Sequence, residues 1–312
     1  MAHAPAPAMT KDGYRVSVFA NIDGLKHAQQ VASLGGEGVG LLRSEFLFME
    51  RTSAPSEDEQ AQAYAAIVRS VGSERPVVIR TLDVGGDKPL PYLPIPREDN
   101  PFLGDRGIRV GLDRPEVLRT QLRAILRASS EGKVAVMFPM ITTLEELRDA
   151  KSMFAEEAKS LGIEPIPCGI MVEVPSVPML MQGFAHEADF FSIGTNDLTQ
   201  YTLAMDRSHP KLAPKVDALN PAVLRMIAQT INGAHAQRRL VGICGGIASD
   251  PQAVPILIGL DVDELSVSLP AIPTVKAQIR RLTRTNCREL AQRALNCWTT
   301  AEVRALEPEY GD

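Results

Sequence analysis

The chain has 312 residues, of which 45% are apolar and 5% aromatic, and its formal net charge is −5. This composition indicates a globular core of aliphatic side chains and excludes a general nucleic-acid-binding surface, which needs a basic face. No apolar run approaches the about 20 residues of a membrane-spanning helix, and the Ala/Pro-rich start lacks the apolar segment of a signal peptide.

The four cysteines are Cys168, Cys244, Cys287 and Cys297, and none of them forms a CxxC pair. Their wide spacing predicts free thiols rather than a disulfide framework, so we expect a reducing, cytoplasmic environment. None of the five histidines lies at a metal-ligand spacing from a cysteine, which argues against a zinc site.

Eight short runs rich in β-branched and apolar residues punctuate the chain. They are residues 16–22, 39–43, 77–83, 134–140, 169–174, 190–194, 240–245 and 264–268. Most are continuously apolar rather than alternating, which is typical of parallel strands that are covered on both faces.

Segments with helical periodicity separate these runs. The clearest are residues 57–71, 115–129, 144–161 and 222–236. Ser56 precedes Glu59 by three residues, and Thr142–Thr143 precede Glu145–Glu146 in the same way. Both spacings are capping boxes, which mark the first turn of a helix.

Eightfold strand–helix alternation within this length predicts an α/β fold of the (β/α)₈ TIM-barrel type. A doubly wound open sheet is the alternative, but no GxGxxG turn follows the first strand. We expect residues 1–12 to be a flexible tail or interdomain linker and residues 13–312 to form the barrel. The Pro/Gly-rich stretch 85–109 directly follows a strand, so we interpret it as an active-site loop.

Charged or reactive residues end or follow five of the eight runs. They are Arg43, Arg80, Asp83, Lys88, Glu173, Asn196, Asp197, Arg207 and Cys244. Taken singly, each of these residues is equally well interpreted as a solvated or salt-bridged surface residue. Gathered at the active face of a barrel, three arginines and two carboxylates are costly to bury unless they bind something. The set predicts a polyanion bound by guanidinium groups, together with a hard divalent cation.

Seven longer segments carry a more specific pattern. They are GVGLLRSEFLFM, RTLDVGGDKPLPY, NPFLGDRGIRV, VMFPMI, MVEVPS, DFFSIGTNDLTQYTLAMDR and GICGGIASD. In this order they closely resemble the C-terminal phosphoenolpyruvate-binding domain of enzyme I of the bacterial sugar phosphotransferase system. Pyruvate phosphate dikinase and phosphoenolpyruvate synthase share a sparser version. The run SIGTNDLTQYTLAMDR is most similar to enzyme I or the fused multiphosphoryl transfer proteins of fructose uptake.

The resemblance implies a role for each matching residue. The substrate-binding residues would be Arg43, Arg80, Lys88, Arg106, Asn196 and Arg207. Glu173 and Asp197 would bind Mg²⁺, and Cys244 would protonate the methylene carbon of the enolpyruvate that remains after phosphoryl transfer. A thiol is a reasonable general acid for that step.

The chain departs from the family where Gly246 replaces the usual Glu after Cys244 and Gly245, which leaves the tuning of the cysteine open. Ser44 in place of Thr is a mild change. The family's phosphorylated histidine, in a Thr-Ser-His segment, is missing, and we interpret His209 as a loop residue. We therefore expect one domain of a larger protein, acting on phosphoenolpyruvate and pyruvate. Its partners would be an N-terminal phosphohistidine domain, an HPr-like phosphocarrier and a second copy, through the helical face.

Two other functions remain open from the sequence. One is a pyruvate-enolate lyase or aldolase, which would not need the phosphate-binding arginines. The other is a non-catalytic dimer that responds to phosphoenolpyruvate.

Overall fold

The computed structural model describes residues 6–85 and 90–308. In this part of the chain, eight parallel strands pair in sequence order into a closed barrel. The strands are β1 (Ser17–Ile22), β2 (Val39–Arg43), β3 (Val77–Arg80), β4 (Val134–Phe138), β5 (Cys168–Val172), β6 (Phe190–Ile193), β7 (Leu240–Cys244) and β8 (Glu264–Ser268). The closing pair is β1 with β8, where Ser17 lies opposite Glu264. The predicted (β/α)₈ barrel is confirmed.

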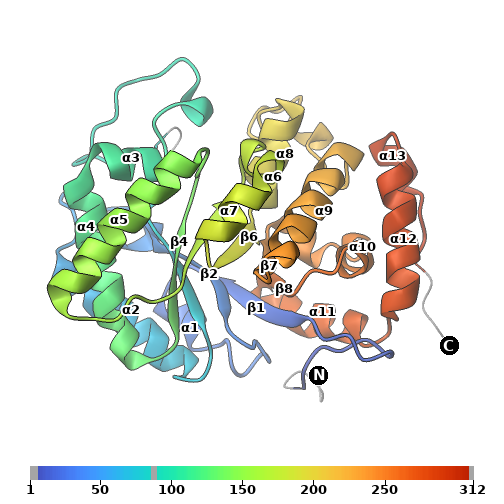
Figure 1. Cartoon of the computed structure of the whole chain (residues 1–312), viewed down its shortest axis with the longest axis horizontal. Helices are drawn as coiled ribbons and strands as arrows, with labels where there is room; N and C mark the ends of the chain where they lie inside the picture. The colour runs from blue at the N-terminus through green and yellow to red at the C-terminus, as the bar shows by residue number, and fades with distance from the viewer. Residues whose placement is uncertain (1–5, 86–89, 309–312) are drawn as a thin grey trace.

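Helices surround the barrel, with α2, α4 and α5 on one side and α9, α10 and α12 on the other (Figure 1). The helices up to α7 are α1 (Leu25–Ala28), α2 (Glu57–Val71), α3 (Ile108–Asp113), α4 (Pro115–Ala128), α5 (Leu144–Leu161), α6 (Ser176–Met179) and α7 (Met181–Glu187). Those that follow are α8 (Thr195–Leu203), α9 (Pro221–Ala236), α10 (Ala253–Gly259), α11 (Ile272–Ile279), α12 (Arg284–Asn296) and α13 (Thr300–Arg304). Within the described residues no helix is long and apolar enough to cross a membrane.

The strands bury both faces, as their continuous apolar runs predict. The outward-facing residues belong to one large core that joins the strands to the helices. A separate cluster fills the barrel and contains Leu41, Val78, Met137, Met171 and Cys244. Because side chains alternate along a strand, residues two positions further on reach the mouth at the carboxyl ends. Arg43, Arg80 and Glu173 occupy such positions.

The helix starts agree with the sequence. The side chains of Ser56 and Glu59 form the predicted capping box of α2, and those of Thr143 and Glu146 form that of α5. The third strand is shorter than expected and ends at Arg80 rather than at residue 83. Side chains replace the strand partner there: the backbone N–H of Leu82 donates to Gln121 Oε1 at 2.8 Å, and that of Asp83 to Glu45 Oε1 at 3.1 Å.

The described part of the N-terminal segment packs on the barrel. Ala8 is fully buried, and its carbonyl accepts a hydrogen bond from the N–H of Val16 at 3.0 Å. The Asp12 carboxylate accepts backbone hydrogen bonds from Arg284 at 2.8 Å and Thr285 at 3.2 Å, in the first turn of α12. Residues 8–12 therefore connect the first strand to the last long helix.

Candidate active site

A polar cavity of about 200 Å³ opens at the carboxyl ends of the strands. Its lining residues are Leu41, Arg43, Arg80, Asp83, Arg106, Met171, Glu173, Gly194, Asn196, Asp197, Arg207 and Cys244. All of the predicted site residues meet here except Lys88, which lies outside the described residues. Residues that end or follow five different strands thus converge on one cavity, as the barrel topology requires.

Arg80 lies at the end of β3 and is 6% exposed. Its Nη2 donates to Glu45 Oε1 at 2.6 Å, and its Nη1 lies 3.2 Å from Asp83 Oδ2. Burial disfavours the charged guanidinium, but the carboxylates of Glu45, Asp83 and Glu173 outweigh that effect and raise the pKa of Arg80 above its ordinary value. Arg80 is therefore a permanent, fixed cation in the wall of the cavity.

Arg106 connects two carboxylates. Its Nε and Nη2 donate to the oxygens of Asp83 at 3.1 Å each, and its Nη1 donates to Asp197 Oδ1 at 2.9 Å. Nη1 also lies 3.3 Å from the hydroxyl of Tyr201, which donates to the carbonyl of Phe102. Burial again opposes the charge, yet Asp83 and Asp197 raise the pKa of Arg106. The paired carboxylates fix this arginine more firmly than a surface ion pair would.

Glu173 and Asp197 are the two carboxylates expected to bind a metal. Glu173 is 1% exposed, and its Oε1 accepts a hydrogen bond from the N–H of Met140 at 2.6 Å. Burial, followed by the negative charges of Asp197 and Asp83, raises the pKa of Glu173 to about 8. Among the described residues, no group of three or more His, Cys, Asp or Glu side chains is arranged to hold a metal ion.

Cys244 forms the floor of the cavity and is 5% exposed. Ser192 Oγ donates to its sulfur at 3.1 Å. Burial raises the pKa of Cys244 to about 11, against a smaller opposing effect of the Ser192 hydrogen bond and Arg80. The thiol is therefore protonated at neutral pH.

The outer part of the cavity is more open to solvent. Arg43 and Asn196 are exposed, and the side chain of Arg207 is 34% exposed and lies 3.4 Å from Asp197 Oδ2. Asn196 Oδ1 accepts a hydrogen bond from the N–H of Gly246 at 3.2 Å, which joins the sixth and seventh strand ends. These more exposed side chains surround the entrance, whereas Arg80 and Arg106 are fixed inside.

His209, interpreted above as a loop residue, lies in the turn after α8. Its Nδ1 accepts a hydrogen bond from the backbone N–H of Lys211 at 3.2 Å. His209 is not among the residues that line the cavity. Its surroundings agree with the interpretation as a loop residue.

Sequence reasoning missed two contributors. Glu45 was given no role, although it lies two residues after Arg43, in the 3₁₀ turn (Ser44–Leu47) that follows β2. Asp83 was noted only as a charged residue near a strand end. The sequence feature that could have identified Glu45 and Asp83 is the clustering of acidic and basic residues at the ends of the second and third strands, in RSE and RTLD.

Comparisons with known proteins agree with this geometry. The profile of the family described as "PEP-utilising enzyme, PEP-binding domain" matches residues 2–284. The chain belongs to this family. Over 301 residues it is 54% identical to a multiphosphoryl transfer protein of Rhodobacter capsulatus, which covers 96% of this chain and 36% of the relative.

Other relatives of the PEP-binding domain have a similar identity. The chain is 47% identical over 311 residues to a phosphoenolpyruvate-protein phosphotransferase of Staphylococcus carnosus, covering 98% of the chain and 54% of the relative.

A citrate lyase from Burkholderia xenovorans LB400 has the same fold, with a TM-score of 0.55, 15% identity, and coverage of 93% of this chain and 84% of the lyase. The chain spans only about one third to one half of the curated relatives it matches.

Proposed function

We propose that this barrel is the phosphoenolpyruvate-binding and catalytic domain of a phosphoenolpyruvate-protein phosphotransferase, the enzyme I of a sugar phosphotransferase system. The observation that carries the proposal is a single cavity with four guanidinium groups, three carboxyl groups and a protonated thiol at its base. Phosphoryl transfer depends on positioning and charge neutralisation rather than on covalent chemistry by the protein, and this cavity supplies both.

The arginines would hold the anionic substrate. Arg43, Arg80 and Arg207 would bind its phosphate and carboxylate groups, with Asn196 and Lys88 on the phosphoryl group. The buried Nε of Arg80 makes no hydrogen bond among the described residues. An unpaired buried donor is unfavourable, so a substrate oxygen is a suitable partner for it. Arg106 keeps its carboxylate partners and would orient Asp197.

The residues also fit a magnesium ion. Glu173 and Asp197 offer hard carboxylate oxygens, the donors that Mg²⁺ prefers. Glu173 Oε2 has no hydrogen bond or ion pair among the described residues, and a side chain at Gly194 would lie 3.1 Å from it, so the glycine keeps that oxygen accessible. The ion would supply positive charge to the transferred phosphoryl group. Asp197 is already paired with Arg106 and Arg207, whereas burial raises the pKa of Glu173 to about 8, so a bound cation would stabilise the ionised form of Glu173.

Cys244 would act after the phosphoryl group has left. Cleavage of the bond between phosphorus and the bridging oxygen leaves enolpyruvate. The S–H bond of Cys244 then breaks as a C–H bond forms at the methylene carbon, which yields pyruvate and a thiolate that regains its proton from solvent. Because burial destabilises the thiolate, the thiol gives up its proton only to a strong carbon base such as the enolate.

The acceptor would be a histidine on a domain outside this chain. We infer an N-terminal phosphohistidine domain, an HPr-like phosphocarrier downstream and a cytoplasmic homodimer, with residues 13–312 as the barrel unit and residues 1–12 as the connection. The names of the multiphosphoryl relatives support these partners.

Calorimetric titration of phosphoenolpyruvate, with and without Mg²⁺, tests the proposal. Wild type should bind the ligand, more tightly with Mg²⁺, and Arg207→Ala should bind at least about tenfold more weakly, the loss of one charge-assisted hydrogen bond. No binding by wild type would overturn the proposal. Exchange of the pyruvate methyl protons with solvent, if it occurs equally well without phosphate and after removal of the arginines, would instead favour a lyase.

A further inference from the structure

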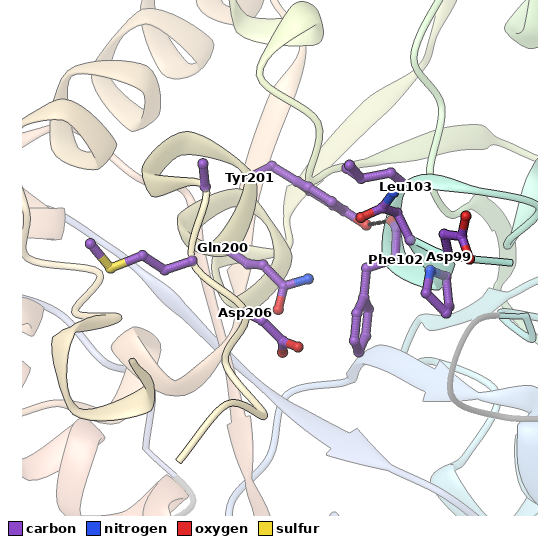
Figure 2. Close-up of a pocket in the computed structure, with 10 residues that line it drawn as sticks. Asp99, Phe102, Leu103, Gln200, Tyr201 and Asp206 are labelled. Carbon is purple, nitrogen blue, oxygen red and sulfur yellow. Dashed lines mark hydrogen bonds between the residues drawn. The ribbon is translucent and has the colours of Figure 1, made fainter. Parts of the chain in front are cut away.

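A second cavity, of about 330 Å³, lies beside the active site between the 3₁₀ turn η2 (Pro101–Leu103) and the end of α8 (Figure 2). Both segments follow strands of the barrel, η2 after β3 and α8 after β6, so the cavity belongs to the same face as the active site. Its walls include Phe102, Leu103 and Met205. Leu103 is 66% exposed, which is high for a leucine beside a cavity.

Gln200 supplies a hydrogen-bond donor that is not used within the molecule. The residue is 4% exposed, and its Oε1 accepts a hydrogen bond from the backbone N–H of Arg207 at 3.0 Å. Its Nε2 has no hydrogen-bond partner among the described residues. Figure 2 shows the amide nitrogen directed into the space opposite Phe102. A donor that faces the cavity from an otherwise buried side chain can bind an incoming acceptor such as a peptide carbonyl.

Asp206 adds a negative charge to the same cavity. Its Oδ1 accepts hydrogen bonds from the N–H and Oγ of Ser208, at 2.7 and 2.6 Å, and these bonds lower the pKa of the carboxyl group. Oδ2 has no partner among the described residues. A donor, a carboxylate and an apolar wall together complement a peptide segment with an apolar and a basic side chain.

The cavity shares its inner wall with the active site. Tyr201 lines it and contacts Arg106 of the active site, while Gln200 holds the backbone of Arg207. A molecule bound in this cavity would therefore contact Tyr201 and Gln200, each of which directly contacts an arginine of the substrate cavity. In-line transfer requires the acceptor nitrogen within about 3.5 Å of the phosphorus, so the protein that carries it must reach the mouth of the substrate cavity, beside this rim.

We propose that this cavity docks a loop of the protein that carries the acceptor histidine, with a peptide carbonyl on Gln200, an apolar side chain against Phe102 and Met205, and a basic side chain near Asp206. The assignment rests on the proposed function above. It names the surface through which the phosphoryl donor site recognises its protein acceptor.

The test is phosphoryl transfer from phosphoenolpyruvate to the phosphohistidine domain, supplied as a separate polypeptide at varied concentration. Leu103→Glu should raise the KM for that domain about tenfold and Asp206→Asn about threefold, as expected for loss of an apolar anchor and of a rim charge. The kcat and the affinity for phosphoenolpyruvate should not change. Leu240→Glu is the matched control, because Leu240 is 65% exposed at the opposite end of the barrel.

A direct binding measurement completes the test. The unphosphorylated domain should bind wild type in the presence of phosphoenolpyruvate and bind Leu103→Glu about tenfold more weakly, a loss of roughly 1.4 kcal/mol. Equal dissociation constants, or no binding to a wild-type chain that does bind phosphoenolpyruvate, would overturn the docking proposal alone. Failure of wild type to bind phosphoenolpyruvate would overturn the proposed function instead.

Discussion

The guanidinium of Arg106 donates two parallel hydrogen bonds to the carboxylate of Asp83, each 3.1 Å long. Both side chains are almost fully buried. The arrangement determines the orientation of Arg106, and its remaining Nη1 then reaches Asp197. A residue in the loop after the third strand thus positions, through one arginine, a carboxylate in the first turn of α8, the helix that follows the sixth strand.

Asp83→Asn should test this relationship. The amide keeps the shape of the side chain but removes its charge and one acceptor, which leaves part of a buried guanidinium unpaired. We expect a loss of about 1–3 kcal/mol in the free energy of unfolding, measured by urea denaturation. Asp58→Asn, on the exposed part of α2, is the control and should change stability by less than about 0.5 kcal/mol. Equal stability of Asp83→Asn and wild type would show that Asp83 is dispensable for holding Arg106.

Cys244→Ala should separate binding from protonation. Removing one sulfur from the base of the cavity leaves the arginines and carboxylates in place, so the affinity for phosphoenolpyruvate should stay within about twofold. Solvent exchange of the pyruvate methyl protons, followed by NMR in D₂O, should fall at least about 100-fold, the usual effect of losing a general acid–base. Because the pKa of Cys244 is about 11, the wild-type thiol should remain protonated between pH 7 and 9. Exchange at the wild-type rate in Cys244→Ala would assign the proton to another group.

The sequence predicted the barrel because parallel strands that are covered on both faces are continuously apolar, and all eight such runs became strands. It predicted the position of most site residues for the same reason: a charged residue at the end of a strand can only reach the mouth. Glu45 was missed because it follows β2 in a 3₁₀ turn, and sequence spacing does not show that this turn directs its carboxylate toward Arg80. The early end of β3 was also not predictable, since it depends on Gln121, which is far along the chain and reaches the backbone of Leu82.

Glu264→Gln should change how stability depends on pH. Glu264 begins β8, and burial, with a smaller contribution from Asp263, raises its pKa from 4.5 to about 8. Between these two values the folded chain binds this proton while the unfolded chain has lost it, so ionisation destabilises the fold as pH rises. The described residues show no hydrogen bond or ion pair that would stabilise the carboxylate.

The glutamine variant should therefore be more stable than wild type at pH 8 and equally stable near pH 4. Its unfolding free energy should fall less steeply with pH, by up to about 1.4 kcal/mol per pH unit. Urea denaturation at several pH values measures the slope. Glu74→Gln, an exposed carboxylate paired with Lys133, is the matched control and should keep the wild-type slope. Parallel curves for Glu264→Gln and wild type would mean that Glu264 is ionised in the folded chain at neutral pH.

Replacement by alanine should destabilise the chain at Gly245 but not at Gly246, the two glycines that follow Cys244. A Cβ at Gly245 would collide with Thr195 Oγ1 and lie 3.2 Å from the Thr195 backbone nitrogen, and Thr195 is fully buried. A Cβ at Gly246 would meet only Asn196 Oδ1, at 3.7 Å, and Gly246 does not have a positive φ. Gly245→Ala should therefore lower the free energy of unfolding by about 1–3 kcal/mol, as overpacking does, and should weaken phosphoenolpyruvate binding by displacing α8. Gly246→Ala should leave both quantities within about 0.5 kcal/mol of wild type. If both variants are equally stable, the close packing of Gly245 against Thr195 does not constrain the turn that presents Cys244.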